Sequence, residues 1–208
     1  MHSLIPTLRR ARVVPVIRTH ATATAETAVR WLHEAGMRIF EITMTVPDAP
    51  ALIRDLASDP DLVVGAGTVR DVASAEACIA AGARFLVTPW VDPEVARVAK
   101  AAGAGMMPGA MTPTEVRAAL AAGADVVKIF PASSAGGPSH LRALSAVFPG
   151  VAFCPTGGVD ARNAPDYLAA GAAFVGIGGK LVDEAAILAG DRASVRRAAE
   201  DALGLMHI

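Results

Sequence analysis

The sequence predicts an α/β fold, a minimal (β/α)8 barrel (TIM barrel) in which residues 1–208 form a single domain. Short β-branched apolar runs alternate with Ala-rich stretches of helical length along the whole chain. Glycines that end helical stretches recur at a nearly constant spacing, as at Gly82, Gly103 and Gly123. The strand candidates are apolar on both faces, which is typical of parallel strands covered by helices. An open doubly wound sheet shares these features, but eight units without a break in period favour the closed barrel.

The eight strand candidates are short and are bounded by glycine or proline. In chain order they cover residues 13–18, 38–44, 62–69, 84–89, 104–111, 125–132, 151–158 and 174–179. The helical stretches between them begin with capping or acidic residues and an early proline, as in Pro93-Glu94 and in the run TPTE at residues 112–115. Each unit therefore carries its own start and stop signals.

Composition and charge exclude several classes of function. With 53% hydrophobic and 19% charged residues the chain can bury a full core. The formal net charge of -1 gives no positive field for nucleic acid or an anionic membrane, so we expect neither partner. The longest uncharged stretch, residues 143–159, holds two prolines and three glycines and is no membrane span.

The first residues and the cysteines indicate a cytoplasmic protein. Arg9, Arg10 and Arg12 occur without an apolar stretch followed by a small-residue cleavage site, so we expect no secretory signal. Cys78 and Cys154 stand far apart and form no CxxC pair, which favours buried reduced thiols. The five histidines show no paired ligand spacing, and we expect no metal.

Lys128 lies in an apolar strand candidate, within the run VVKIFP at residues 126–131. Burial of an ammonium group is costly unless it is paired or neutralised. The apolar setting therefore favours the uncharged amine, which attacks carbonyl groups to form Schiff bases. The alternative is an ion-paired lysine at the mouth of the barrel.

Glu41 is the matching acidic residue, in the apolar run RIFEITM at residues 38–44. The second and sixth strands of an eight-stranded ring face one another, so Glu41 and Lys128 are expected to point at each other across the mouth. A carboxylate there can move protons for the amine. A buried ion pair without a catalytic role is the alternative, and close mutual pairing is expected in both cases.

Two glycine-rich strand ends, PTGGV at residues 155–159 and GIGGK at residues 176–180, close the chain's last two units. Loops after the seventh and eighth strands of such a barrel commonly bind phosphate, because backbone N–H groups can approach the anion closely. The alternative is tight turns without a ligand. The substrate contacts expected from these two loops are Thr156, Gly157, Gly158, Gly178 and Gly179.

Arg18 ends the first strand candidate and can bind a substrate carboxylate through two parallel hydrogen bonds. A solvated charge at a strand end fits the sequence equally well. The turn GAGT at residues 65–68 adds the Thr68 hydroxyl as a further candidate contact.

Taken in order, these motifs resemble the class I aldolases that act on 2-keto-3-deoxy-6-phosphogluconate and often also on 4-hydroxy-2-oxoglutarate. The resemblance runs over about residues 13–182. It is carried by FEITMTVP at 40–47, VGAGTV at 64–69, VTP at 87–89, MPG at 107–109, VKIFP at 127–131 and PTGG at 155–158.

This resemblance implies the roles of individual residues. Lys128 is then the Schiff-base lysine and Glu41 the general acid/base. Thr68 and Pro89 line the pocket, Phe130 packs over the substrate, and the phosphate end is formed by Thr156, Gly157 and Gly158. The products are pyruvate and glyceraldehyde 3-phosphate, or pyruvate and glyoxylate from 4-hydroxy-2-oxoglutarate. The resemblance further implies no cofactor and a homotrimer.

Three positions bear on the substrate. Related phosphogalactonate aldolases tend to carry an aliphatic residue in place of Thr156, and a hydroxyl there favours the gluconate epimer. Many family members have an arginine for the substrate carboxylate where this chain has Thr45, so Arg18 is expected to take that duty. Lys180 stands where a small residue or serine is usual.

Two other functions remain open at this point. An epimerase would use Lys128 and Glu41 as acid and base without a covalent link, and would give no adduct with pyruvate and borohydride. A non-catalytic sugar-phosphate binding barrel would be stabilised by ligand but would release no pyruvate.

Overall fold

The computed structural model describes residues 4–205 and contains a short parallel strand within every strand candidate. The strands are β1 (Val13–Ile17), β2 (Ile39–Thr43), β3 (Val63–Gly67), β4 (Phe85–Val87), β5 (Gly105–Met107), β6 (Gly109–Ala110), β7 (Val127–Ile129), β8 (Phe153–Pro155) and β9 (Val175–Ile177). The fifth candidate contains both β5 and β6, which Pro108 separates. The strand positions are confirmed, although the strands are shorter than expected because the ends of the candidates form loops.

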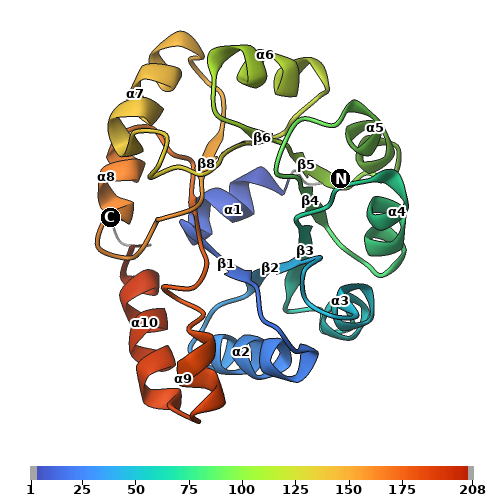
Figure 1. Ribbon diagram of the computed structural model, residues 1–208, viewed down its shortest axis with the longest axis vertical. Helices are drawn as coiled ribbons and strands as arrows, with labels where there is room; N and C mark the ends of the chain where they lie inside the picture. The colour runs from blue at the N-terminus through green and yellow to red at the C-terminus, as the bar shows by residue number, and fades with distance from the viewer. Residues whose placement is uncertain (1–3, 206–208) are drawn as a thin grey trace.

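The strands form one six-stranded sheet in the order β5-β4-β3-β2-β1-β9 and one three-stranded sheet in the order β6-β7-β8. All strand pairs are parallel. Two isolated parallel bridges, Phe153 with Ala172 and Thr156 with Gly176, connect the chain around β8 with that around β9. The molecule is thus an α/β fold with a curled parallel sheet, and Figure 1 looks along the axis of that curl.

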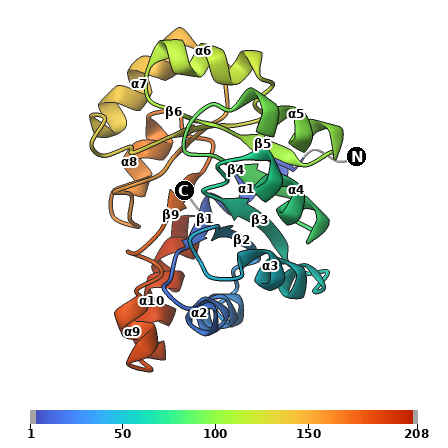
Figure 2. The same cartoon turned by 45° about the vertical axis from the view of Figure 1, so that its right-hand side comes forward.

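Helices cover the outside of the strands. They are α1 (Ile5–Ala11), α2 (Thr22–Glu34), α3 (Ala49–Ala57), α4 (Val72–Ala80), α5 (Pro93–Ala101), α6 (Pro113–Ala121), α7 (Gly137–Val147), α8 (Ala164–Ala169), α9 (Glu184–Leu188) and α10 (Arg192–Gly204). Figure 2 shows α3, α4 and α5 on the outer side of β3 to β5.

The local signals for helix starts and ends are confirmed. Asp92 caps α5, and Thr112 forms a capping box with Glu115 at the start of α6. The glycines after α2, α4, α5, α6 and α8 have φ between 72° and 112°, the left-handed region that glycine enters without steric cost. Helix α1 was not expected from the sequence.

Apolar side chains form two layers, one between strands and helices and one enclosed by the strands. The enclosed layer, here called the inner core, consists of Leu8, Val14, Ile39, Phe85, Val87, Met107, Val126, Ala152, Cys154, Ala173 and Phe174. Alternation along each strand sorts the residues: Ile39 faces the inner core, whereas Phe40 and Ile42 face the helices. Leu8 of α1 belongs to the inner core, so α1 closes the amino ends of the strands (Figure 1).

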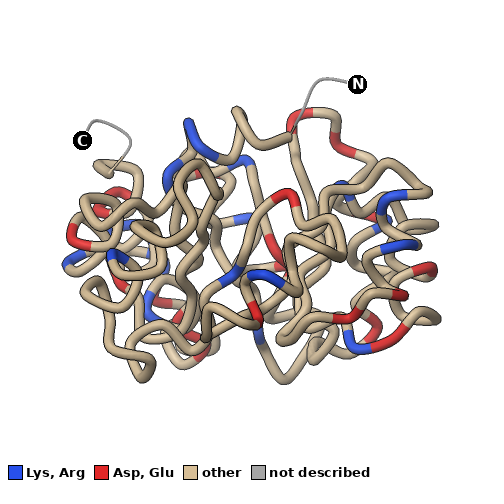
Figure 3. The backbone as a smooth tube through the Cα atoms, turned by 90° about the horizontal axis from the view of Figure 1, so that it is seen from above, with Lys and Arg blue, Asp and Glu red and all other residues tan. Residues whose placement is uncertain are grey.

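The distribution of charged residues and the state of the two cysteines can be compared with the sequence expectations. Basic and acidic residues are interspersed along the chain (Figure 3). Cys78 and Cys154 are both free and buried, as expected. None of the helices described in residues 4–205 is long and apolar enough to cross a bilayer.

Candidate active site

Two buried charged side chains mark the interior at the carboxyl ends of the strands. Glu41 on β2 is 5% exposed and Lys128 on β7 is 4% exposed, and in residues 4–205 every other buried polar side chain is a threonine. Each lies two residues beyond a member of the inner core, Ile39 and Val126, and therefore faces the same interior. The strands thus bring the two groups into one enclosed space.

The expectation that Glu41 and Lys128 pair closely is wrong. Neither residue takes part in the ion pairs found within residues 4–205, and Glu41 Oε1 has no hydrogen-bond partner there. The physical reason is their position, because β2 and β7 belong to different sheets and no strand ladder brings the two side chains together. The Lys128 amine therefore forms no ion pair with the Glu41 carboxylate.

Glu41 is nevertheless influenced by the positive charges of the site. Burial raises the pKa of its carboxyl group above the usual 4.5, and the charges of Lys128 and Arg18 oppose that rise. A raised pKa makes this carboxyl group a better proton acceptor than an ordinary carboxylate.

Lys128 is surrounded by Phe130, Gly109 and Cys154. Its Nζ lies 4.9 Å from the centroid of the Phe130 ring, and in the sheet it is aligned with Gly109 of β6 and Cys154 of β8. Burial raises the pKa of the Cys154 thiol to about 12, so this neighbour is an uncharged group. From the sequence, Cys154 was expected only to be a buried thiol, although its position two residues before Thr156 on the same strand places both side chains on one face.

Pro89 is held at the mouth by a close contact between backbones. A Cβ atom at Gly109 would lie 2.9 Å from the carbonyl oxygen of Thr88 and even nearer to Pro89, so only glycine permits this approach. The Thr88 side chain is fully buried, and its hydroxyl donates to the carbonyl of Trp90. The loop that carries Pro89 is thereby fixed beside the strand next to Lys128.

Arg18 and Thr68 meet at the ends of β1 and β3. Arg18 Nη2 donates to Thr68 Oγ1 at 3.2 Å, while the arginine side chain remains exposed. Thr68 has φ 56°, an uncommon conformation for a β-branched residue. Thr45, at the position where an arginine is common, is exposed and shares a 2.7 Å hydrogen bond with Thr43.

The loops after β8 and β9 lie side by side, joined by the bridge between Thr156 and Gly176. Gly157 and Gly158 have φ of 92° and 75°. Their carbonyl groups accept hydrogen bonds from Ser133 N at 3.0 Å and Asn163 Nδ2 at 2.9 Å, respectively.

The N–H groups of Gly158 and Gly179 donate to no backbone acceptor in the loops of the described residues, 4–205. Free N–H groups on adjacent glycine-rich turns form a concave site for an anion. Gly178 and Gly179 follow β9 directly, and Lys180 is exposed beside them. Ser133, which packs against Gly158, is a neighbour that the sequence did not indicate.

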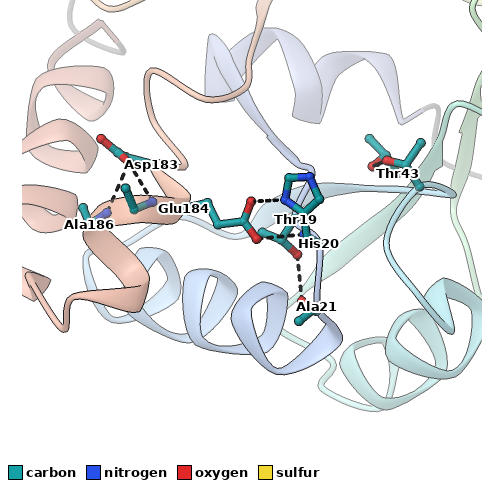
Figure 4. A network of polar contacts seen from close by, with 9 residues as sticks. Thr19, His20, Ala21, Thr43, Asp183, Glu184 and Ala186 are labelled. Carbon is teal, nitrogen blue, oxygen red and sulfur yellow. Dashed lines mark hydrogen bonds and ion pairs between the residues drawn. The ribbon is translucent and has the colours of Figure 1, made fainter.

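A polar link joins the loop after β1 to the start of α9 (Figure 4). The Glu184 carboxylate accepts the backbone N–H of His20 at 2.7 Å and contacts His20 Nδ1 at 2.7 Å. Asp183 caps the same helix by accepting from the N–H groups of Ala185 and Ala186. The loop that carries Arg18 is thus tied to the segment that follows Gly178 and Gly179.

A large cleft lies away from this site. A cavity of about 570 Å³ lies near α1, where residues such as Leu4, Ile5, Gly105 and Met107 line it. It includes neither Glu41 nor Lys128. We therefore place the candidate active site by its buried charged groups, at the carboxyl ends of the strands, rather than by cavity size.

A buried lysine and a buried glutamate at the carboxyl ends of parallel strands, beside glycine-rich loops that can hold an anion, define a class of lysine-dependent α/β enzymes. Residues 4–198 match the family model described as "KDPG and KHG aldolase", in which KDPG is 2-keto-3-deoxy-6-phosphogluconate and KHG is 4-hydroxy-2-oxoglutarate. The chain belongs to this family, and the resemblance found in the sequence is confirmed.

Individual relatives support the assignment over nearly the full length. The chain is 37% identical over 196 residues to a 2-dehydro-3-deoxy-phosphogluconate aldolase of Pseudomonas aeruginosa, covering 94% of this chain and 89% of that protein. It is 38% identical over 205 residues to a probable 2-dehydro-3-deoxy-6-phosphogalactonate aldolase of Rhizobium meliloti, covering 96% and 95%. A solved KDPG aldolase from Legionella pneumophila, with pyruvate captured as a covalent carbinolamine, superimposes with a TM-score of 0.85 at 31% identity, covering 96% and 98%.

Proposed function

We propose that this protein is a Schiff-base (class I) aldolase, a carbon-carbon lyase that reversibly cleaves 2-keto-3-deoxy-6-phosphogluconate to pyruvate and glyceraldehyde 3-phosphate. It would also cleave 4-hydroxy-2-oxoglutarate to pyruvate and glyoxylate. The observation that carries the proposal is the pair of buried charged groups, Lys128 and Glu41, which reach one interior from different sheets without pairing. Membership of the aldolase family supports it.

The proposed reaction begins at the Lys128 amine. Nζ adds to the C2 carbonyl carbon, and loss of water gives an iminium ion. The electron pair of the C3–C4 bond then moves into the iminium, and Glu41 accepts the proton of the C4 hydroxyl as the aldehyde forms. Glu41 returns a proton to C3 of the enamine, and water releases pyruvate from the lysine. The iminium is the electron sink, so we propose neither a cofactor nor a metal.

The other predicted residues would orient the substrate along the mouth. Arg18, held by Thr68, would bind the carboxylate at one end. Phe130 and Pro89 would line the middle. The phosphate would be held at the other end, where free N–H groups and a hydroxyl gather, by Thr156, Gly157, Gly158, Gly178 and Gly179.

We infer that the two sheets form one closed eight-stranded barrel of a single domain. Pro108 interrupts one strand to give β5 and β6, and the two bridges near β8 and β9 support closure on the other side.

We further propose a cytoplasmic homotrimer. Exposed apolar side chains such as Trp90 support an assembly, and a designed cage built from symmetric oligomeric domains is among the structural neighbours. Light scattering on purified protein tests this, because a monomer mass would exclude the trimer.

Trapping with pyruvate and borohydride tests the covalent mechanism. We expect one reduced pyruvyl adduct, located on Lys128 by peptide mass spectrometry, and none in Lys128→Met. Lys100→Met on α5 is the matched control, because Lys100 is exposed and hydrogen-bonded at a helix end, and it should be labelled like the wild type. Pyruvate release without any adduct would exclude the Schiff base and favour acid/base chemistry of the epimerase kind.

A second candidate substrate is 2-keto-3-deoxy-6-phosphogalactonate, which the Rhizobium meliloti relative favours. Cleavage rates for the gluconate, galactonate and hydroxy-oxoglutarate substrates in one assay distinguish the possibilities. We expect the gluconate substrate to react fastest, and Thr156→Val to shift the preference toward the galactonate epimer. A faster galactonate reaction in the wild type would reverse this assignment.

A further inference from the structure

We propose that Gly67 is a positioning residue whose missing side chain sets the place of the Glu41 carboxylate, an inference that rests on the proposed role of Glu41 as acid and base. Gly67 ends β3, the strand paired with β2, and its partner in the ladder is Thr43, two residues after Glu41. Val64 and Ala66 of β3 face the helices. Gly65 and Gly67 therefore face the interior, on the side where Glu41 stands.

The Glu41 side chain occupies the space that a side chain at position 67 would need. A Cβ atom at Gly67 would lie 2.7 Å from both Cγ and Cδ of Glu41, and closer still to Oε1. Carbon atoms normally approach to about 3.5 Å. An alanine at position 67 therefore cannot coexist with the carboxylate in its present place.

Packing against Gly67, rather than hydrogen bonding, holds the Oε1 side of the carboxylate. Oε1 is buried and has no hydrogen-bond partner within residues 4–205. Buried polar atoms of this kind are uncommon and require an explanation, such as a catalytic role. With no donor to retain it, the carboxylate should turn away when the space over Gly67 is filled.

Gly67→Ala is an informative substitution because the backbone tolerates it. Gly67 is not among the glycines with positive φ. The expected change is therefore a displaced Glu41 carboxylate rather than a strained strand. Gly65→Ala is the matched control, on the same strand and the same face, because its Cβ would meet the Phe85 ring of the inner core instead of Glu41.

Two partial reactions with pyruvate separate Glu41 from Lys128. Borohydride trapping reports the competence of the Lys128 amine, whereas exchange of the pyruvate methyl hydrogens for deuterium in D2O also needs an acid/base. In Gly67→Ala we expect trapping near the wild-type level and exchange slower by roughly 10- to 100-fold, the scale of losses from a misplaced catalytic group. Gly65→Ala should lower the melting temperature and keep the ratio of exchange to trapping.

A shorter acid tests the same steric relation. Glu41→Asp withdraws the carboxylate by one methylene, so its exchange penalty should be smaller in the Gly67→Ala background than in the wild type. Equal penalties, or exchange at the wild-type rate in Gly67→Ala, would overturn the proposal.

A crystal structure of Gly67→Ala is a readout independent of activity. It should show Glu41 Oε1 displaced, and a carboxylate in its present place beside a shifted β3 would also overturn the inference. A wild-type protein that neither forms an adduct nor exchanges would instead contradict the proposed function, and the crystal structure would still decide the role of Gly67.

Discussion

Burial of Glu41 opposes ionisation of its carboxyl group, and this makes the folding stability of the protein depend on pH. The folded-state pKa of Glu41 is raised above 4.5. The folded state therefore binds this proton more tightly than the unfolded state does. The resulting contribution to stability is complete below about pH 4.5 and is lost as the pH rises through the folded-state pKa.

Glu41→Gln should remove this pH-dependent loss. We expect the variant to be inactive in cleavage, more stable than the wild type at neutral pH, and without that advantage below about pH 4.5. Thermal unfolding from pH 4 to pH 8 measures the difference. The control is Glu26→Gln on α2, an exposed glutamate, which should follow the wild-type profile. A difference between Glu41→Gln and wild type that does not vary with pH would contradict the argument.

Thr68 holds Arg18 through one exposed hydrogen bond, so its removal should affect binding rather than chemistry. Loss of such a bond is worth about 1 kcal/mol, or roughly a fivefold change in affinity. We expect Thr68→Ala to raise KM about fivefold for the keto acid substrates with kcat almost unchanged. Thr68→Ser keeps the hydroxyl and should retain the wild-type KM. An unchanged KM in Thr68→Ala would show that Arg18 does not depend on this contact.

Sequence chemistry predicted the charged residues of the site better than their arrangement. Lys128 and Glu41 were identifiable because each lies in an apolar run, where burying a charge costs free energy unless the charge is paired or neutralised. Their separation depends on which strands face one another and on the space over Gly67, which no local pattern contains. The same holds for Ser133, whose contact with Gly158 joins two distant loops.

At the level of elements, the predictable features are those whose signals are local. The start of α6 was predictable from Thr112 and Glu115 because capping bonds join residues three positions apart. Helix ends were predictable from glycines with positive φ. Helix α1 escaped prediction because it is seven residues long and its single fully buried residue, Leu8, is fixed by contacts with distant strands.

The link between Glu184 and His20 ties two loops that would bind opposite ends of the substrate. Glu184→Ala removes both contacts and should raise KM severalfold for phosphorylated substrates while kcat changes little. Glu184→Gln retains an acceptor for the His20 N–H and should recover most of the wild-type KM. Steady-state kinetics on the two variants decide this. Equal KM values in Glu184→Ala and wild type would show that the loops hold their positions without the link.

On the scale of the whole molecule, the inner core and α1 separate stability from chemistry. Most of the inner core lies toward the amino ends of the strands. Glu41 and Lys128 lie toward the carboxyl ends, two positions after the inner-core residues Ile39 and Val126. The apolar character of both strand faces was predictable from the sequence. The split into sheets of six and three strands was not, because it depends on Pro108 and on the two bridges near β8 and β9.

Leu8→Ala should therefore weaken the fold and leave the site intact. Leu8 is fully buried at the amino ends of the strands, and truncation of such a residue typically costs about 2–5 kcal/mol. We expect a lower urea midpoint with unchanged kcat and KM at temperatures where the variant is folded. Leu188→Ala on α9 is the control, because Leu188 is 72% exposed and should change neither quantity. A marked change in KM for Leu8→Ala would contradict this separation.

Because α1 closes the interior at the amino ends of the strands, reactants and products must enter and leave at the carboxyl ends. In the proposed reaction the three-carbon acid would remain bound to Lys128 after the C3–C4 bond breaks. The aldehyde half must then depart first and the keto acid second, whereas in the synthetic direction pyruvate must enter ahead of the aldehyde. The closed end and the covalent bond to Lys128 together would give an ordered sequence of binding and release.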